Sequence, residues 1–166
     1  MASAGIVEGY GPPPGAAVRW AEPKAEQLDF WCGSWQAETV GGELVGAEAA
    51  RNEVAWEWGR AVVVEDFTMP TDDGTFHGRS WSVPVPGRGW CQTWVDSDGQ
   101  YLDFVGGLVG DELLLDRDAR SRTGGRVRQR MLWWDVSAES FSWAWLSAED
   151  RAREWSLRWE LRYTRV

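Results

Sequence analysis

The adjacent carboxylates Glu65 and Asp66 are the strongest candidates in this sequence for proton transfer. They follow the three valines Val62-Val63-Val64, a run typical of a β-strand. Neighbouring side chains on a strand point to opposite faces, so one of the two carboxylates should point inward. A buried carboxylate is costly unless a cation such as Arg79 or Arg130 pairs with it. If it is unpaired, its pKa rises, and Glu65 could then serve as a general acid; the alternative is a structural ion pair.

The single histidine, His77, is a second candidate, because imidazole titrates near neutral pH and can move protons. It alternates with Arg79 and Trp81 on one face of the expected strand. The alternative is a surface histidine close to a hairpin turn. One histidine without a Ser-His-Asp arrangement gives no support for nucleophilic hydrolysis. Arg130 is a further candidate because it lies well inside its strand, whereas the other nearby arginines surround a glycine turn. The expected catalytic residues are Glu65, His77, Arg79 and Arg130.

Fourteen tryptophans in 166 residues are more than a small core needs for sealing. Indole rings can simply fill a core, and Trp35 is expected to plug one end of the fold. Their faces can also stack on flat ligands and attract cations. We therefore expect some of them to line a pocket for a hydrophobic or aromatic small molecule. The expected ligand-binding residues are Trp56, Trp58, Gln92, Trp94, Trp133, Trp143, Trp145 and Trp159.

These side chains should stand on short β-strands, because apolar residues recur every second position along most of the chain. Ten such segments follow one another at roughly ten-residue spacing, separated by Gly, Pro, Asp and Ser. In the last segment Trp155, Leu157, Trp159, Leu161 and Tyr163 are expected to share one face. The pattern predicts an all-β protein, an up-and-down antiparallel barrel of about ten strands. A closed sheet has no free edges, and about ten strands leave room for a ligand.

The first 25 residues differ from the rest in composition. They contain Gly9-Tyr10-Gly11-Pro12-Pro13-Pro14-Gly15 and few large apolar side chains. We expect residues 1–25 to form a flexible arm, one that could lie across a barrel end, and residues 26–166 to form the barrel domain. The segment Pro23 to Trp31 is the best candidate for a helix.

Composition excludes several classes of function. The net charge of −9 gives no electrostatic reason to bind nucleic acid, and no apolar run is long enough for a membrane helix. The two cysteines, Cys32 and Cys91, cannot form a zinc site, and their pairing is left open. We expect no metal and no cofactor. No secretory signal is visible, so a cytoplasmic location is expected, and a homodimer remains an option.

Four motifs in this order resemble a large bacterial family of lipocalin-like barrels whose function is mostly unassigned. They are Gly33-Ser34-Trp35, Gly78-Arg79-Ser80, Gly89 to Asp96, and Leu161 to Arg165. The resemblance covers roughly residues 27 to 165 and implies a lipocalin-like barrel. The related nitrobindins hold haem through a histidine near the C-terminus, and this chain has no histidine after His77.

Some relatives of lipocalin-like barrels act as cyclases or isomerases without a redox cofactor, and the likeness to them lies in the fold alone. This analogy and the tryptophan excess lead to the expected function, a cofactor-free cyclase or isomerase of specialised metabolism. A carrier or sensor that binds the same kind of molecule unchanged is the alternative. Haem binding is the third interpretation.

Overall fold

The computed structural model describes residues 9–166, which form ten strands and one short 3₁₀ helix, η1 (Ala25–Trp31). The strands are β1 (Gly33–Gly42), β2 (Ala50–Glu57), β3 (Val62–Thr71), β4 (Gly74–Val85), β5 (Gly89–Asp96), β6 (Tyr101–Val109), β7 (Glu112–Arg120), β8 (Arg126–Trp134), β9 (Ser140–Glu149) and β10 (Ser156–Arg165). No helix among the described residues is long and apolar enough to cross a membrane.

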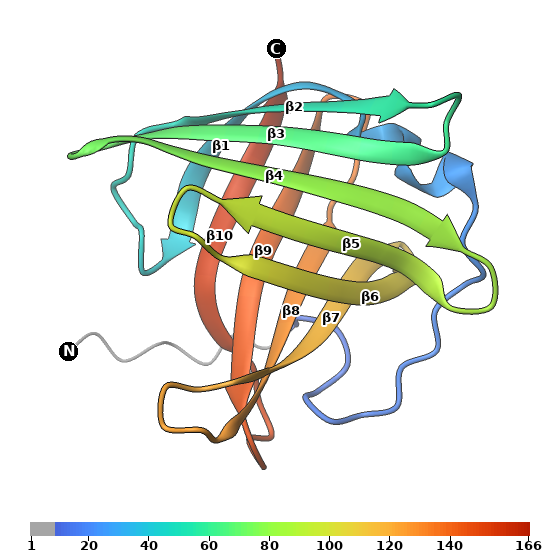
Figure 1. Cartoon of the computed structure of the whole chain (residues 1–166), viewed down its shortest axis with the longest axis vertical. Coiled ribbons are helices and arrows are strands. Elements are labelled where there is room, and N and C mark those ends of the chain that lie inside the picture. The colour runs from blue at the N-terminus through green and yellow to red at the C-terminus, as the bar shows by residue number, and fades with distance from the viewer. Residues whose placement is uncertain (1–8) are drawn as a thin grey trace.

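Each strand pairs antiparallel with its neighbour in the chain, and β10 returns to pair with β1. The sheet is therefore a closed up-and-down barrel (Figure 1), as the sequence predicts. Closure leaves no free strand edge, which explains how many short segments form one stable sheet. It also sorts side chains into an inner and an outer set, because neighbouring residues alternate between the two faces.

A β-bulge in β10 corrects the face expected for its first residues. The register of β10 against β9 shifts between Leu157 and Trp159, so strict alternation fails there. Trp155 precedes the strand and packs, together with Leu157, into a cluster on the outside of the barrel around Leu132 and Leu146. Trp159, Leu161 and Tyr163 keep the inward face.

One end of the barrel is closed by η1 and by large aromatic side chains. Trp35 on β1 is almost fully buried, and its indole nitrogen donates a 2.8 Å hydrogen bond to the carbonyl of Trp31 on η1. The Arg165 guanidinium lies 4.2 Å from the centre of the Trp35 ring. Gly33 makes this contact possible, since a Cβ there would stand 2.1 Å from Arg165. The expectation that Trp35 plugs one end is confirmed.

Residues 9–24 of the expected arm lie on the outer wall and then run to η1, which begins at Ala25, the last residue of that arm (Figure 1). The Trp20 indole donates to the carbonyl of Arg88, and the Ala21 amide donates to the carbonyl of Leu108 at 2.8 Å. Tyr10 is buried and joins the outer cluster around Leu132 and Leu146. This part of the arm is thus held against the barrel by specific contacts. The first eight residues of the arm lie outside the described residues.

Candidate functional site

A cavity of about 670 Å³ occupies the barrel on the side away from η1. Its mouth is formed by the β1–β2 connection, with Glu43 and Leu44, and by the β5–β6 turn, with Asp98 and Gln100. The volume falls in the range of pockets that hold drug-sized ligands. The hollow predicted from strand number and tryptophan content is therefore present.

Most of the cavity wall is aromatic. Five indoles line it, together with Phe67 and Phe76; the five are Trp94, Trp133, Trp143, Trp145 and Trp159. The rings brace one another edge to face: Trp159 meets Trp143 at 5.7 Å and 88°, and it meets Phe67 at 5.8 Å and 90°. Each such contact adds about 0.5–1.5 kcal/mol beyond the area that it buries. The wall is therefore both apolar and held in place.

Gly78 makes room for one of these rings. It sits on the inner face of β4, and a Cβ there would stand 2.1 Å from the Trp94 indole of β5. The Trp94 nitrogen in turn donates a 2.9 Å hydrogen bond to Asp96 near the mouth. The glycine of Gly78-Arg79-Ser80 thus has a packing role, because it allows Trp94 to lie flat against the wall.

Glu65 is the one buried carboxylate of the cavity wall among the described residues. Its two oxygens accept hydrogen bonds from the Asn52 amide on β2, at 2.8 Å, and from the Ser80 hydroxyl on β4, at 2.7 Å. No arginine or lysine forms an ion pair with it in the described part of the chain. Burial raises the pKa of this carboxyl to about 7, against the lowering effect of the two hydrogen bonds. Glu65 can therefore exchange a proton at neutral pH.

Other polar side chains surround Glu65 toward the closed end of the barrel. Tyr163 of β10 lines the cavity, and burial, followed by the nearby Glu65 charge, raises the pKa of its phenol well above the usual value. Gln92 on β5 donates to the Ser82 hydroxyl of β4 at 2.9 Å. The buried oxygens Oδ1 of Asn52 and Oε1 of Gln92 have no donor. Neither Asn52 nor Gln92 lines the cavity, so this end presents the Glu65 carboxyl and the Tyr163 phenol to a guest.

The structure places most, but not all, of the expected ligand-binding residues at the cavity. Five of the expected tryptophans line it, as described above, and Gln92 is buried in the barrel interior. Trp56 instead lies by the closed end, where its nitrogen donates to Asp29 of η1. Trp58 falls in the β2–β3 turn with a φ of 51° and is 80% exposed. Both positions are corrections: Trp56 keeps the inner face of β2 but lies at the closed end, and Trp58 leaves the alternation because the strand ends at Glu57.

His77 and Arg79 do not reach the cavity. Both alternate with Trp81 on β4, as expected, but this face points outward and His77 is exposed. Arg79 pairs at 2.7 Å with Asp66, the carboxylate that points away from the cavity. The expectation that a cation pairs with the inward carboxylate is therefore wrong for Arg79, because the two residues face opposite sides of the sheet.

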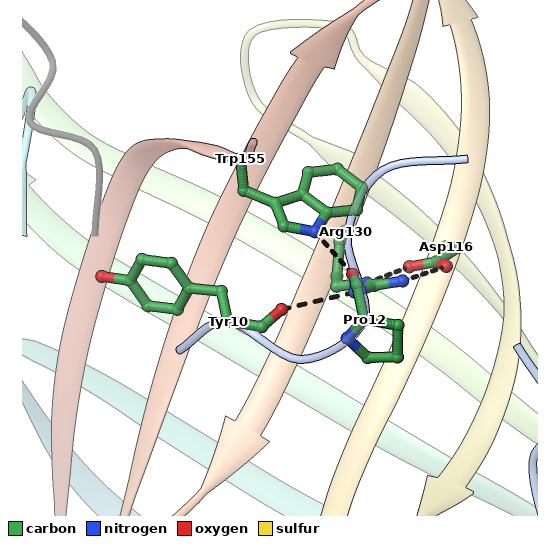
Figure 2. Close-up of polar contacts among 5 residues, drawn as sticks. All are labelled: Tyr10, Pro12, Asp116, Arg130 and Trp155. Carbon is green, nitrogen blue, oxygen red and sulfur yellow. Dashed lines mark hydrogen bonds and ion pairs between the residues drawn. The ribbon is translucent and has the colours of Figure 1, made fainter. Parts of the chain in front are cut away.

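Arg130 also lies outside the cavity, on the outer face of β8 (Figure 2). Its guanidinium makes two hydrogen bonds to the carboxylate of Asp116, at 2.7 and 2.8 Å. It also donates to the carbonyls of Tyr10 and Pro12 and lies 4.5 Å from the Trp155 ring centre. The prediction that Arg130 lies well inside its strand is confirmed, but the strand register places its side chain on the outer face, toward the arm. Arg130 therefore holds the arm and cannot pair with Glu65.

Sequence reasoning missed the polar residues that surround Glu65. Asn52 and Ser80 are fully buried, and Tyr163 closes the group from β10. A signal for Asn52 existed, because it is the only asparagine and shares a face with apolar residues of β2. The alternation places Tyr163 on one face with Trp159 and Leu161 but does not single it out as a polar group of the site. Ser80 has no distinctive spacing and could not be found without the pairing of β3 and β4.

The described cavity does not fit haem held by a histidine. The chain has one histidine, and it stands exposed on the outer face of β4. Comparison with known proteins adds no assignment: no protein-family model matches the chain, and no curated protein sequence matches it.

Proposed function

We propose that the protein binds a flat hydrophobic small molecule in the aromatic cavity and transfers a proton to or from it through Glu65. It would act as a cofactor-free isomerase or cyclase on a specialised metabolite. The observation that carries the proposal is the buried Glu65 carboxyl, which has no counter-cation and a pKa near 7 in a wall of indoles. A catalytic acid works best when its pKa lies close to the working pH.

The chemistry needs only the groups already in the cavity. Protonated Glu65 gives its proton to a double bond or a carbonyl oxygen of the guest, and the guest becomes a cation. The guest then rearranges or closes a ring and loses a proton from another atom to the Glu65 carboxylate. No atom or electron is gained overall. The indole faces stabilise the intermediate cation, each by about 0.5–2 kcal/mol.

Binding is tested with Nile red, a neutral flat dye whose fluorescence rises in apolar surroundings. The native chain should bind it, and Met131→Trp should abolish binding, because Met131 lines the cavity. The matched control is Val83→Trp, which adds the same ring on the outer face of β4. Equal dye binding by the native chain and both variants would place the dye elsewhere and contradict the proposal.

Proton transfer is tested with 2-tetralone, a flat bicyclic ketone whose α-hydrogens exchange with D₂O. Here the Glu65 carboxylate removes the α-proton and later returns a deuteron. The rate of α-hydrogen exchange, monitored by NMR, should be higher with the native chain than in buffer alone. In Glu65→Gln this acceleration should fall by about 100-fold or more. His77→Ala should exchange as fast as the native chain, because His77 lies outside the cavity.

A non-catalytic carrier is the second candidate. It is favoured by the outward positions of His77, Arg79 and Arg130, which leave few ionisable groups to act on a guest. Dye binding without any acceleration of exchange by the native chain would support the carrier and exclude proton transfer to this ketone.

A further inference from the structure

Glu65 and Tyr163 are the ionisable groups that the inner part of the cavity presents to a guest. The Glu65 carboxyl is buried and is held by Asn52 and Ser80, neither of which lines the cavity. Among the described residues, no arginine or lysine forms an ion pair with it. A buried carboxylate without a cation carries a desolvation cost, which a cationic guest can relieve. A guest that becomes a cation at this position therefore complements Glu65.

The aromatic walls of the cavity also favour a cationic guest. The five lining indoles and the two phenylalanines present rings whose faces attract cations. Two of the indole nitrogens are already used within the protein: Trp94 donates to Asp96, and Trp159 donates to Thr39. The N–H groups of these two rings are therefore not free to bind a guest.

The mouth is acidic. Glu43, Asp96 and Asp98 line it, and Arg158 is the one cation that lines the cavity among residues 9–166. Arg158 is already held by the carboxylate of Glu43 and the hydroxyl of Ser147, each at 2.6 Å. A cleft lined by negative charge attracts cations and repels anions. An entering carboxylate would therefore meet repulsion at the mouth and again at Glu65.

Arg117 is the nearest competitor for an anionic guest. It lies on β7 behind the lining residue Gln129, to which it donates a hydrogen bond, and its guanidinium is 5.8 Å from the Phe104 ring centre. Its Nε has no acceptor. Arg117 does not itself line the cavity, so an acid that uses it must displace the contact with Gln129.

From these four features we infer that the guest is a flat compound with a basic nitrogen, such as an imine or a benzylic amine, that enters as the free base and accepts the proton of Glu65. This inference rests on the proposed function and names its substrate class. The Glu65 O–H bond breaks, the nitrogen lone pair forms the new N–H bond, and the carboxylate remains beside the cation. An imine protonated in this way has an electrophilic carbon, which is what a ring closure needs.

The test uses three guests with one skeleton: 1-naphthylmethylamine, 1-naphthylmethanol and 1-naphthoate. Each competes with Nile red for the native chain at pH 7. We expect the amine to bind at least tenfold more tightly than the alcohol, and the carboxylate to bind most weakly. Glu65→Gln should remove most of the advantage of the amine over the alcohol. Glu53→Gln is the matched control, because Glu53 is exposed on the outer face of β2 and should leave the order unchanged.

Asp98→Asn is a second variant that leaves the barrel interior intact. It should weaken binding of the amine by a smaller factor than Glu65→Gln does, since Asp98 contributes only to the negative charge of the mouth.

The outcomes separate the inference from the proposed function. Binding of 1-naphthoate as tight as that of the amine would overturn the inference. Loss of that binding in Arg117→Ala would show that Arg117 holds the acid, and the cavity would remain the binding site. An amine preference that persists in Glu65→Gln overturns the role of Glu65 as the partner of the nitrogen. Failure of the native chain to bind Nile red or any of the three guests overturns both.

Discussion

Glu65 and Arg130 are both buried charged residues in the middle of strands, yet their surroundings differ completely. Arg130 faces outward, its side chain is 2% exposed, and Asp116 and two carbonyls of the arm satisfy its charge and its donors. Glu65 faces the cavity and accepts only two neutral hydrogen bonds. One charge is compensated by the fold, and the other is not.

This difference separates a structural role from a chemical one. A buried charge with a complete set of partners adds little that a ligand could use, and removing it leaves its partners stranded. A buried carboxyl without a cation has a raised pKa and a proton that it can give away near pH 7. The molecule therefore holds one buried charge that fixes the arm and one that is available to a guest.

The largest expected effect is the pH dependence of Glu65→Gln. Below pH 4.5 the Glu65 carboxyl is protonated in both the folded and the unfolded chain, so its burial costs little. Above that pH the unfolded chain ionises first, and the folded chain loses stability until its own pKa, about 7, is passed. The free energy of unfolding of the variant, relative to the native chain, should rise by about 3 kcal/mol between pH 4.5 and pH 8.

Urea unfolding across this pH range measures the effect, with Glu53→Gln as the control. A difference between native chain and Glu65→Gln that does not change with pH would show that Glu65 ionises normally in the folded chain.

Arg130→Ala should have the next largest effect. It leaves Asp116 without its cation and frees two carbonyls of the arm, at a cost of about 2–3 kcal/mol in the free energy of unfolding. This value is below the usual range for a buried pair because the Asp116 side chain is 32% exposed. Arg128→Ala is the control on the same outer face and should change stability little.

Nile red binding should survive Arg130→Ala, because the side chain lies outside the cavity (Figure 2). A variant that keeps its stability but no longer binds the dye would contradict the division of roles between Arg130 and Glu65.

Ser80→Ala sharpens the account of Glu65 by removing one of its two hydrogen bonds. Because the hydroxyl stabilises the ionised carboxylate, its loss should raise the pKa of Glu65 further, by about one unit. The midpoint of the pH-dependent stability should move upward accordingly. Ser82→Ala is the matched control, since the Ser82 hydroxyl serves Gln92. Equal shifts in the two variants would mean that the Ser80 contact has no special effect.

Arg79→Ala should have the smallest effect. It breaks the Arg79–Asp66 ion pair, whose side chains are 59% and 43% exposed, so less than about 1 kcal/mol of stability is lost. Exchange of 2-tetralone should continue at the native rate. A large loss of exchange in this folded variant would return Arg79 to the catalytic candidates.

The barrel could be predicted from the sequence because its signal is local and repeated. Period-two alternation and turn residues mark each strand, and many short strands without free edges require closure. The errors occur where alternation stops: Trp58 follows the end of β2, and Trp155 precedes a bulge in β10. Neither the strand end nor the bulge has a composition that distinguishes it.

The candidate site could be predicted only in part. Alternation alone shows that Glu65 and Asp66 face opposite sides, but not which one faces inward. That choice depends on how β3 aligns with β2 and β4, which is a long-range property. The same register decides that Arg79 and Arg130 pair with outer aspartates. The arm on the outer wall likewise joins residues more than a hundred positions apart.

The most direct test of the central claim is a ¹³C NMR titration of the side-chain carboxyl carbons, with Glu65→Gln used to assign the Glu65 resonance. We predict that the Glu65 carboxyl titrates with a midpoint near pH 7. A midpoint at or below 4.5 would contradict the account, because it would show a carboxylate already compensated by a cation or by water.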